Sequence, residues 1–296
     1  MKTQLMALVS LLAVAAFAGG RAWADPAADA AAPAGFDQPR DVPHGQVTSE
    51  TYESQTLGFK RELTIYTPPG YSKDKKYPVL YLLHGSGDDQ TGWVKKGSAN
   101  VVLDNLYADK KAEPMIVVMP YGFTSKPGEA ALGRGASPDD RRKAAGQFEQ
   151  DLLKDVIPFI ESHYPVVADS DHRALAGLSM GGGQTMRIGP MHPDTFAWLG
   201  IFSAGLGRRP ATNPSNPGTP DITASYPDAD TLNSHIKLLW VSCGDKDPGL
   251  EGAKKLDAAL TEKKVNHVWH QDTGAHEWPV WKNDLYLFGQ RLFRNG

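Results

Sequence analysis

The feature that most constrains this chain is an apolar segment that runs directly into a serine flanked by glycines. Residues 173–178 are apolar after their first position, which is typical of a strand buried on both faces of a sheet. Ser179 follows within the sequence Gly177-Leu178-Ser179-Met180-Gly181, and a helix is predicted over residues 184–191. A strand, a sharp turn and a helix in this order project a serine hydroxyl from the edge of a sheet. The sequence therefore predicts Ser179 as a nucleophile on such a turn.

The glycines around Ser179 have a steric reason. A side chain at position 177 or 181 would collide with the neighbouring backbone at so tight a turn. The helix after the turn points its amide dipoles at the serine, which favours a developing negative charge. A phosphate-binding loop is disfavoured because no Gly-Lys-Ser/Thr follows. The remaining alternative is a glycine-rich turn with an incidental serine.

Further apolar segments alternate with helical patterns along the chain. The texture of strands buried on both faces recurs at 77–83, 115–119, 198–203 and 236–242. Strands with one solvent-exposed face are predicted at 47–56 and 60–67. Amphipathic helices are predicted over 148–160, with a kink or restart at Pro158, and over 250–263 and 280–293. Strands that alternate with helices predict an α/β fold with a mostly parallel sheet covered on both faces.

The first 45 residues differ in character from the rest of the 296-residue chain. Lys2, the apolar run 5–18 and the sequence Ala22-Trp23-Ala24 predict a secretory signal peptide over residues 1–24, cleaved after Ala24. An uncleaved anchor is the alternative, although the run is short for a membrane span. Residues 25–45 predict a flexible leader, and residues 46–296 predict one catalytic domain. We therefore expect a secreted or periplasmic protein.

Charge and cysteine content exclude several partners and sites. The formal net charge of −3 gives no electrostatic reason to expect nucleic acid, or a membrane surface once the signal peptide is removed. Cys243 is the single cysteine, which excludes an internal disulfide and disfavours a cysteine-based zinc site. It is predicted to be a small buried hydrophobic residue.

A serine nucleophile needs a base, and His276 is the best candidate. The expected chain order is Ser, then Asp or Glu, then His. His276 lies in a loop of small residues between a predicted strand at 265–271 and the last predicted helix, which places it at the carboxyl edge of the sheet. His267 and His270 fall inside that strand and are predicted to be packed or solvated. A metal site formed by the three is disfavoured because successive strand residues face opposite ways.

The acid and the oxyanion hole are predicted from the ends of two other strands. Asp245 and Asp247 both follow the strand that ends at residue 244. The distance from the strand end favours Asp247 as the carboxylate that orients the imidazole, while Asp245 caps the turn or faces solvent. The oxyanion is expected to be held by the backbone amides of Met180 and of Ser86, the latter in the loop after strand 77–83. His84 is predicted to be structural.

Two segments show no strand or helix periodicity, residues 121–146 and 205–234. They are predicted to lie above the carboxyl edge of the sheet, where ligands bind in such folds. Aromatic residues near this edge are candidates for stacking on an aromatic acyl group, with ordinary packing as the alternative. The candidates are Trp93, Tyr121, Phe123, Tyr226 and Trp278. Arg208 and Arg209 are candidates for meeting a carboxylate, with simple solvation as the alternative.

Several motifs together resemble one enzyme family. The sharpest are 82–85 (Leu-Leu-His-Gly), 172–183, 196–204, Cys243-Gly244-Asp245-Lys246-Asp247 and 274–281. From about residue 46 to 294 the chain resembles carbohydrate esterase family 1, serine esterases of the α/β-hydrolase superfamily that include bacterial feruloyl and acetyl xylan esterases. The resemblance implies the α/β-hydrolase fold, the triad Ser179, Asp247 and His276, oxyanion amides at Ser86 and Met180, and no metal or cofactor. It also implies a substrate among the feruloyl or acetyl esters of plant polysaccharides, or a small-molecule ester.

The expected reaction is acyl transfer to water through an acyl-enzyme. The alternatives are transfer to an alcohol acceptor, hydrolysis of another small ester as in enterochelin esterases or S-formylglutathione hydrolase, a peptidase, and a binding protein on an inactive hydrolase scaffold. The filled triad positions disfavour the last of these. The proline-rich segment 205–234 departs from the family and bears on the substrate, because loops set specificity in such folds.

Overall fold

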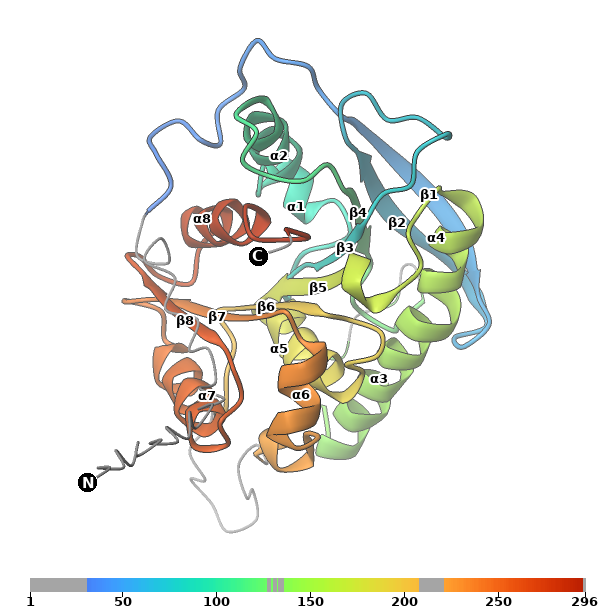
Figure 1. Ribbon diagram of the computed structural model, residues 1–296. Coiled ribbons are helices and arrows are strands. Elements are labelled where there is room, and N and C mark those ends of the chain that lie inside the picture. Colours follow the sequence, from blue (N-terminus) through green and yellow to red (C-terminus); the bar gives the residue numbers. More distant parts are fainter. Residues whose placement is uncertain (1–30, 127–128, 130–131, 133–135, 208–220, 295–296) are drawn as a thin grey trace, which may run out of the picture.

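The computed structural model describes residues 31–126, 129, 132, 136–207 and 221–294 (Figure 1). These residues form a sheet with the strand order β1-β2-β4-β3-β5-β6-β7-β8. The strands are β1 (Gln46–Ser54), β2 (Phe59–Thr67), β3 (Val79–Leu83), β4 (Ile116–Pro120), β5 (Arg173–Leu178), β6 (Trp198–Phe202), β7 (Leu238–Gly244) and β8 (Val268–Asp272). The pairs β1·β2 and β2·β4 are antiparallel, and every other pair is parallel. The predicted α/β fold with a mostly parallel sheet is confirmed.

Helices cover both faces of this sheet (Figure 1). On one face lie α1 (Gly92–Lys95), α2 (Ala99–Ala108) and α8 (Trp278–Gly289). On the other lie α3 (Pro138–Asp151), α4 (Ile157–His163), α5 (Met180–Ile188), α6 (Ala229–His235) and α7 (Leu250–Glu262). Successive residues of β3 alternate between the two cores: Tyr81 packs with the second group of helices, and Leu80 with the first. Burial on both faces explains why these strands are continuously apolar.

The predicted break at Pro158 takes the form of a helix that widens just before the proline. Between α3 and α4 the chain forms a π-helical turn, η1 (Leu152–Val156), in which the Ile157 amide donates to the Leu152 carbonyl. Pro158 has no amide to donate, and its ring would clash with the carbonyl four residues earlier in a regular helix. The wider turn lets one long helix pass the proline without ending.

The two segments predicted to lack regular structure are partly helical. Helix α3 begins at Pro138, and the Ser137 hydroxyl caps it by accepting a hydrogen bond from the Asp140 amide at 3.1 Å. The second segment contains a short 3₁₀ turn, η4 (Ile222–Ser225), and most of α6. Its central part, residues 208–220, lies outside the described residues.

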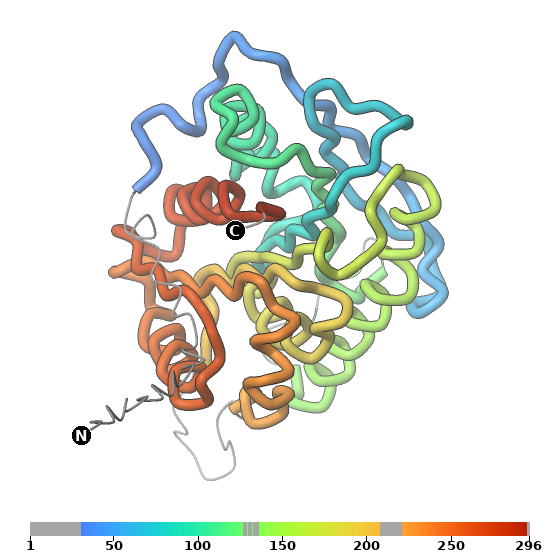
Figure 2. The backbone as a smooth tube through the Cα atoms, viewed as in Figure 1, coloured from blue at the N-terminus to red at the C-terminus, as the bar shows by residue number. Residues whose placement is uncertain are grey.

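Residues 31–45, part of the segment 25–45 predicted to be a flexible leader, make defined contacts with α2 and α8. The Asn105 amide group donates to the Phe36 and Gln38 carbonyls at 2.9 Å each, and the Gly45 amide donates to Asp104 at 2.8 Å. Figure 2 follows this segment over the outside of α2 to β1 at the edge of the sheet. The segment is ordered because side chains distant in sequence bind its backbone, although it has no periodicity of its own.

The predicted signal peptide, residues 1–24, and residues 25–30 lie outside the described part of the chain. Within the described part, no helix combines the length and the apolar character needed to cross a bilayer.

Candidate active site

Ser179 occupies a strained turn between β5 and α5. Its backbone has φ 52° and ψ −106°, a combination that side-chain-bearing residues rarely adopt. Two backbone hydrogen bonds hold the turn: the Ser179 amide donates to the Phe202 carbonyl at 2.9 Å, and the Gly181 amide donates to the His84 carbonyl at 3.1 Å. The hydroxyl is thereby fixed at the carboxyl end of the central strand.

The flanking glycines are required by close backbone contacts. A Cβ on Gly177 would lie 2.6 Å from the Gly181 carbonyl carbon, and one on Gly181 would lie 2.6 Å from the Leu83 carbonyl oxygen. Both distances are far below van der Waals contact, and the atoms concerned are backbone. The turn therefore packs against the end of β3 only when both positions lack a side chain.

The structure brings Ser179, His276 and Asp247 into one hydrogen-bonded chain. His276 Nε2 lies 2.8 Å from Ser179 Oγ, and His276 Nδ1 lies 2.8 Å from Asp247 Oδ2. Both distances are within normal hydrogen-bond range. A carboxylate at Nδ1 keeps the proton on that nitrogen, which leaves Nε2 free to accept a proton from the serine hydroxyl.

Asp247 is held as an anion in a buried position. Its side chain is fully buried, and its second carboxylate oxygen accepts the Gly249 amide at 2.6 Å. Burial opposes ionisation, but the hydrogen bonds from His276 and the Gly249 amide outweigh it, so the pKa of Asp247 lies below its ordinary value. The carboxylate therefore stays charged beside the imidazole throughout the neutral range.

Asp245 has a different position and a different partner. It is exposed, and its carboxylate accepts the Gly274 amide at 2.8 Å. This contact fixes the turn that leads to His276. The Trp281 indole meets the imidazole edge to face, with ring centroids 5.0 Å apart. Asp245 therefore holds the turn before His276 through the Gly274 amide. Trp281 in turn restricts the orientation of the His276 ring.

The two amides predicted to form an oxyanion hole are open in this structure. Met180 is the first residue of α5, so its amide has no carbonyl partner within the helix. Among the described residues, neither this amide nor that of Ser86 donates to another backbone group. The carbonyl of His84, two residues before Ser86, accepts the Gly181 amide. That bond ties the loop carrying Ser86 to the turn carrying Ser179.

His84 joins this loop to the segment after β4. Its Nδ1 donates to the Gly85 carbonyl at 2.8 Å, and its Nε2 accepts the Gly122 amide at 2.8 Å. Burial lowers the pKa of His84, which keeps the ring in the neutral form that these two bonds require. The Gln184 side chain of α5 donates to the Gly122 carbonyl at 2.8 Å. His84 is structural, as predicted, and it fixes the segment containing Tyr121 and Phe123.

A buried ion pair also holds the segment that contains Tyr121 and Phe123. Arg61 of β2 pairs with Asp151 of α3 at 2.5 Å, and both side chains are at most 1% exposed. The other guanidinium nitrogen donates to the carbonyls of Tyr121 and Phe123. The sequence analysis missed Arg61, because one arginine in a strand with a solvent-exposed face is normally read as solvated.

Three of the five aromatic candidates lie beside the candidate triad or the loops next to it. The rings of Tyr121 and Phe123 form a cluster with His84, with each centroid 5.7 Å from the imidazole and 5.5 Å from the other, and both rings are partly exposed. Trp278, partly exposed, lies two residues after His276 and packs edge to face on Trp281 at 5.3 Å. These three rings stand beside the elements that carry the triad.

Trp93 is buried, which corrects its prediction as a pocket residue, whereas the role of Tyr226 stays a prediction. Trp93 is 1% exposed, and its indole donates to the Leu83 carbonyl at 2.9 Å, so it supports Trp278 from within the core. The Tyr226 hydroxyl donates to the Met186 carbonyl at 2.6 Å, about 10 Å along α5 from Ser179. Arg208 and Arg209 lie outside the described residues.

The two histidines of the predicted strand at 265–271 and the cysteine lie away from the candidate triad and have structural contacts. His267 meets Asp257 at 2.8 Å, and His270 is buried in β8. Cys243 is buried as predicted, and burial raises the pKa of its thiol to about 12, which makes it unreactive. No cluster of three or more metal-ligating side chains occurs in the described ranges.

Fold and site together define a class: an α/β-hydrolase fold that carries a serine, a histidine and an aspartate in hydrogen-bonded order. Residues 54–287 match the family model described as "Esterase: Putative esterase". The chain belongs to this esterase family.

Relatives of known name agree with the family. The chain is 33% identical over 262 residues to the "Endo-1,4-beta-xylanase/feruloyl esterase" of Xylanibacter ruminicola, a match that covers 86% of this chain and 32% of the relative. It is 32% identical over 149 residues to "Endo-1,4-beta-xylanase Y" of Acetivibrio thermocellus, covering 47% of this chain and 12% of the relative. The chain thus spans about a third or less of these relatives.

The similar solved structures include a CE1 ferulic acid esterase from the anaerobic fungus Anaeromyces mucronatus in complex with ferulic acid. The TM-score is 0.76 at 25% identity, and the match covers 89% of this chain and 96% of that one. The S-formylglutathione hydrolase of Staphylococcus aureus, with a TM-score of 0.63 at 19% identity over 85% of this chain and all of that one, shares the fold.

Proposed function

We propose that this protein hydrolyses carboxylic esters, with Ser179 as the nucleophile. The observation that carries the proposal is the chain of two 2.8 Å contacts from Ser179 through His276 to Asp247, built on a turn with positive φ. A serine alcohol is a weak nucleophile until a base accepts its proton. The arrangement supplies that base, and a buried carboxylate supplies the charge that stabilises its cation.

The reaction proceeds in two steps. Ser179 Oγ attacks the ester carbonyl carbon while His276 Nε2 takes the hydroxyl proton, and the amides of Ser86 and Met180 hold the resulting oxyanion. The intermediate collapses when the carbon–oxygen bond to the alcohol breaks and His276 returns the proton to the leaving oxygen. Water then attacks the acyl-enzyme, His276 takes its proton, and the same collapse releases the acid and restores the Ser179 hydroxyl.

The proposed substrates are feruloyl or acetyl esters carried by plant polysaccharides. The relative that matches 86% of the chain is named a xylanase/feruloyl esterase, and a structural neighbour was solved with ferulic acid. The partly exposed rings of Tyr121, Phe123 and Trp278 support an aromatic acyl group, because flat rings stack favourably. We further propose that the protein is exported after removal of residues 1–24, which N-terminal sequencing of the secreted or periplasmic protein tests.

The experiment compares Ser179→Ala with a matched control, Ser234→Ala, whose hydroxyl lies on the exposed surface of α6. With methyl ferulate as substrate, Ser179→Ala should lose nearly all turnover while its thermal unfolding stays close to that of the parent. The control should keep full turnover. A fluorophosphonate probe should label the parent and the control and fail to label Ser179→Ala. Parent-like turnover by Ser179→Ala would refute the assignment.

A further inference from the structure

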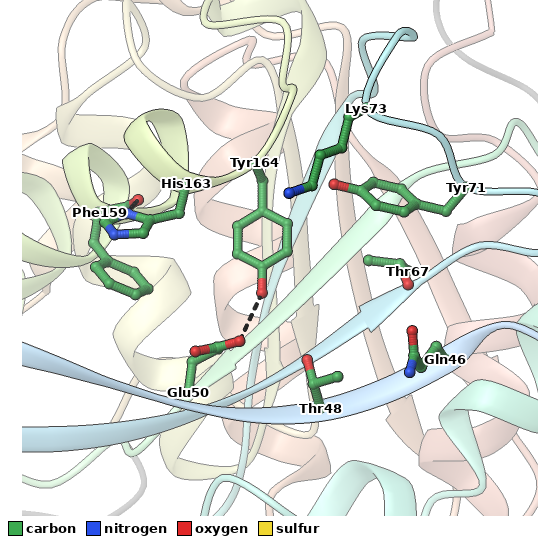
Figure 3. A pocket seen from close by; sticks show the side chains of 9 residues that line it. All are labelled: Gln46, Thr48, Glu50, Thr67, Tyr71, Lys73, Phe159, His163 and Tyr164. Atoms are coloured by element: carbon green, nitrogen blue, oxygen red, sulfur yellow. Dashed lines mark hydrogen bonds between the residues drawn. The ribbon is translucent and has the colours of Figure 1, made fainter.

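A groove, seen from close by in Figure 3, lies away from Ser179 at the end of the sheet where β1 begins and β2 ends. Its volume is about 280 Å³, and it is lined by the start of β1, the end of β2 with the loop that follows, and the end of α4. The lining residues that matter for recognition are Glu50, Thr67, Tyr71, Lys73, Phe159 and Tyr164.

The position of the groove separates it from the candidate active site. Tyr77 pairs with Val166, two residues after Tyr164, at the amino end of β3, whereas His84 and the Ser179 turn lie at the carboxyl end. Strand residues rise about 3.3 Å each, so the two sites are roughly 20 Å apart along β3. The groove is therefore no subsite of the catalytic pocket, and its ligand must contact the protein independently of the ester bond.

Aromatic rings give the groove firm surfaces. Figure 3 shows Tyr164 in the middle, with Tyr71 and Lys73 on one side and Phe159 and His163 on the other. Tyr71 is supported by the Tyr77 ring behind it at 5.4 Å, and Phe159 stacks on the His163 ring at 4.2 Å. Rings fixed in this way present apolar faces at little cost in side-chain entropy.

Polar groups stand beside these rings, and their charges balance. The Tyr164 hydroxyl donates to Glu50 Oε1 at 3.2 Å, which orients the carboxylate at the floor of the groove (Figure 3). Lys73 supplies the one formally cationic side chain and Glu50 the one anionic side chain among the lining residues, with His163 counted as neutral. A polyanion would meet Glu50, a polycation would meet Lys73, and an apolar ligand would leave both without hydrogen-bond partners.

We propose that this groove binds a neutral polysaccharide chain, the polymer that carries the ester. Such a ligand has apolar ring faces for the aromatic side chains and hydroxyls that both donate to Glu50 and accept from Lys73. Binding here would keep the protein on its polymer while ester bonds react at Ser179. The identity of the polymer rests on the proposed function, but the recognition of a neutral polyol does not.

The test measures binding in the absence of hydrolysis. The full chain with Ser179→Ala is run in native gels that contain soluble arabinoxylan, xylan or polygalacturonate. Tyr71→Ala, Glu50→Gln and Lys73→Ala are added singly, with Lys254→Ala on the exposed face of α7 as the control that removes the same charge. Neutral polymers should retard the Ser179→Ala chain. Adding Tyr71→Ala should weaken that binding about tenfold, as expected for one lost aromatic contact. Lys254→Ala should bind like the parent.

The proposal would be overturned if neither neutral polymer retarded the chain, or if all three groove variants were retarded as much as Lys254→Ala. Retardation by polygalacturonate alone would also overturn it. Unfolding temperatures identify any variant that fails to fold, and three separate variants keep the test decisive. Turnover of methyl ferulate by the same groove variants with Ser179 intact should match the parent. If the unsubstituted chain does not hydrolyse methyl ferulate, the proposed function is refuted. The binding measurements would then still test whether the groove binds a neutral polysaccharide.

Discussion

Replacing Arg61 by methionine tests how the buried ion pair controls the aromatic segment beside the candidate active site. The substitution keeps much of the side-chain volume but removes the cation, so the buried Asp151 carboxylate keeps the hydrogen bond from the Tyr52 hydroxyl but not its charged partner. Breaking a buried pair in this way costs about 3–5 kcal/mol of unfolding free energy. The carbonyls of Tyr121 and Phe123 lose their guanidinium donor as well.

The loss of stability should depend on pH, with a definite sign. Burial raises the pKa of Asp151 even with Arg61 present, and removing the cation raises it further. The folded variant therefore holds a proton on Asp151 that the unfolded chain releases near pH 4. Its stability falls as pH rises above that point, by at most about 1.4 kcal/mol per pH unit. Urea unfolding of parent and variant at pH 5 and pH 8 should show a deficit that is larger at pH 8.

A second substitution separates the charge from the tether. Adding Asp151→Asn to Arg61→Met removes the uncompensated carboxylate, so most of the lost stability should be recovered and the added pH dependence should disappear. The segment at Tyr121 and Phe123 still lacks its donor in the double variant. We expect KM for an aromatic ester to rise at least about tenfold in both variants, because the segment loses two hydrogen bonds to a charged group, with little change for an acetyl ester. An Arg61→Met variant with parental unfolding free energy at pH 8 and parental KM would refute this reasoning.

Three further perturbations test other parts of the site and the core. Asp247→Asn should lower kcat for methyl ferulate about 10⁴-fold by stabilising the wrong imidazole tautomer, whereas Asp245→Asn should change it little; the reverse order in steady-state kinetics would assign the acid to Asp245. Burial raises the pKa of Asp284 to about 8, so the folded chain binds a proton that the unfolded chain releases near pH 4, and stability falls between these values. Asp284→Asn should flatten the dependence of Tm on pH over that range, and an unchanged slope would contradict the argument. Gly181→Ala, which forces a Cβ against backbone, should lose about 1–3 kcal/mol of stability and most turnover, whereas Gly183→Ala in the same helix, with nothing within 4 Å of its added Cβ, should lose neither; denaturation and kinetics of the pair check this.

The parts of the molecule that could be predicted from sequence are those governed by local pattern and chain order. The strand at 173–178 was marked by its apolar residues, and helix α7 begins and ends within a residue of its predicted bounds of 250–263. The proximity of His276 to Ser179 followed because both come after parallel strands, and such strands end at one edge of the sheet. A pattern repeated along the chain and a rule of topology were sufficient in these cases.

The start of helix α3 is marked in the sequence by capping residues, although its hydrophobic periodicity does not predict a helix. Its first turns are strongly polar, so hydrophobic periodicity does not mark it. Ser137 before Pro138, followed by Asp139 and Asp140, is nevertheless a standard start for a helix: a capping hydroxyl, a proline in the first turn and acidic residues near the positive end of the dipole. Capping residues therefore carried information that periodicity did not.

Arg61 and Trp93 show where sequence reasoning ends. The partner of Arg61 is Asp151, far along the chain, and neither residue type predicts burial by itself. Trp93 lies close in sequence to the loop that carries Ser86, but whether an indole lines a site or supports it from within depends on packing. The same limit explains residues 31–45, whose order depends on Asp104 and Asn105.

The bonds of His84 have a consequence for attempts to redesign this protein. One imidazole links the loop that follows β3 to the segment that follows β4, so neither can be exchanged alone without disturbing the other. A chimera that imports residues 121–126 from a relative with a different preference should work only when residues 84–87 come from the same donor. A new substrate specificity would then require exchanging the loop after β3 and the segment after β4 together rather than one at a time.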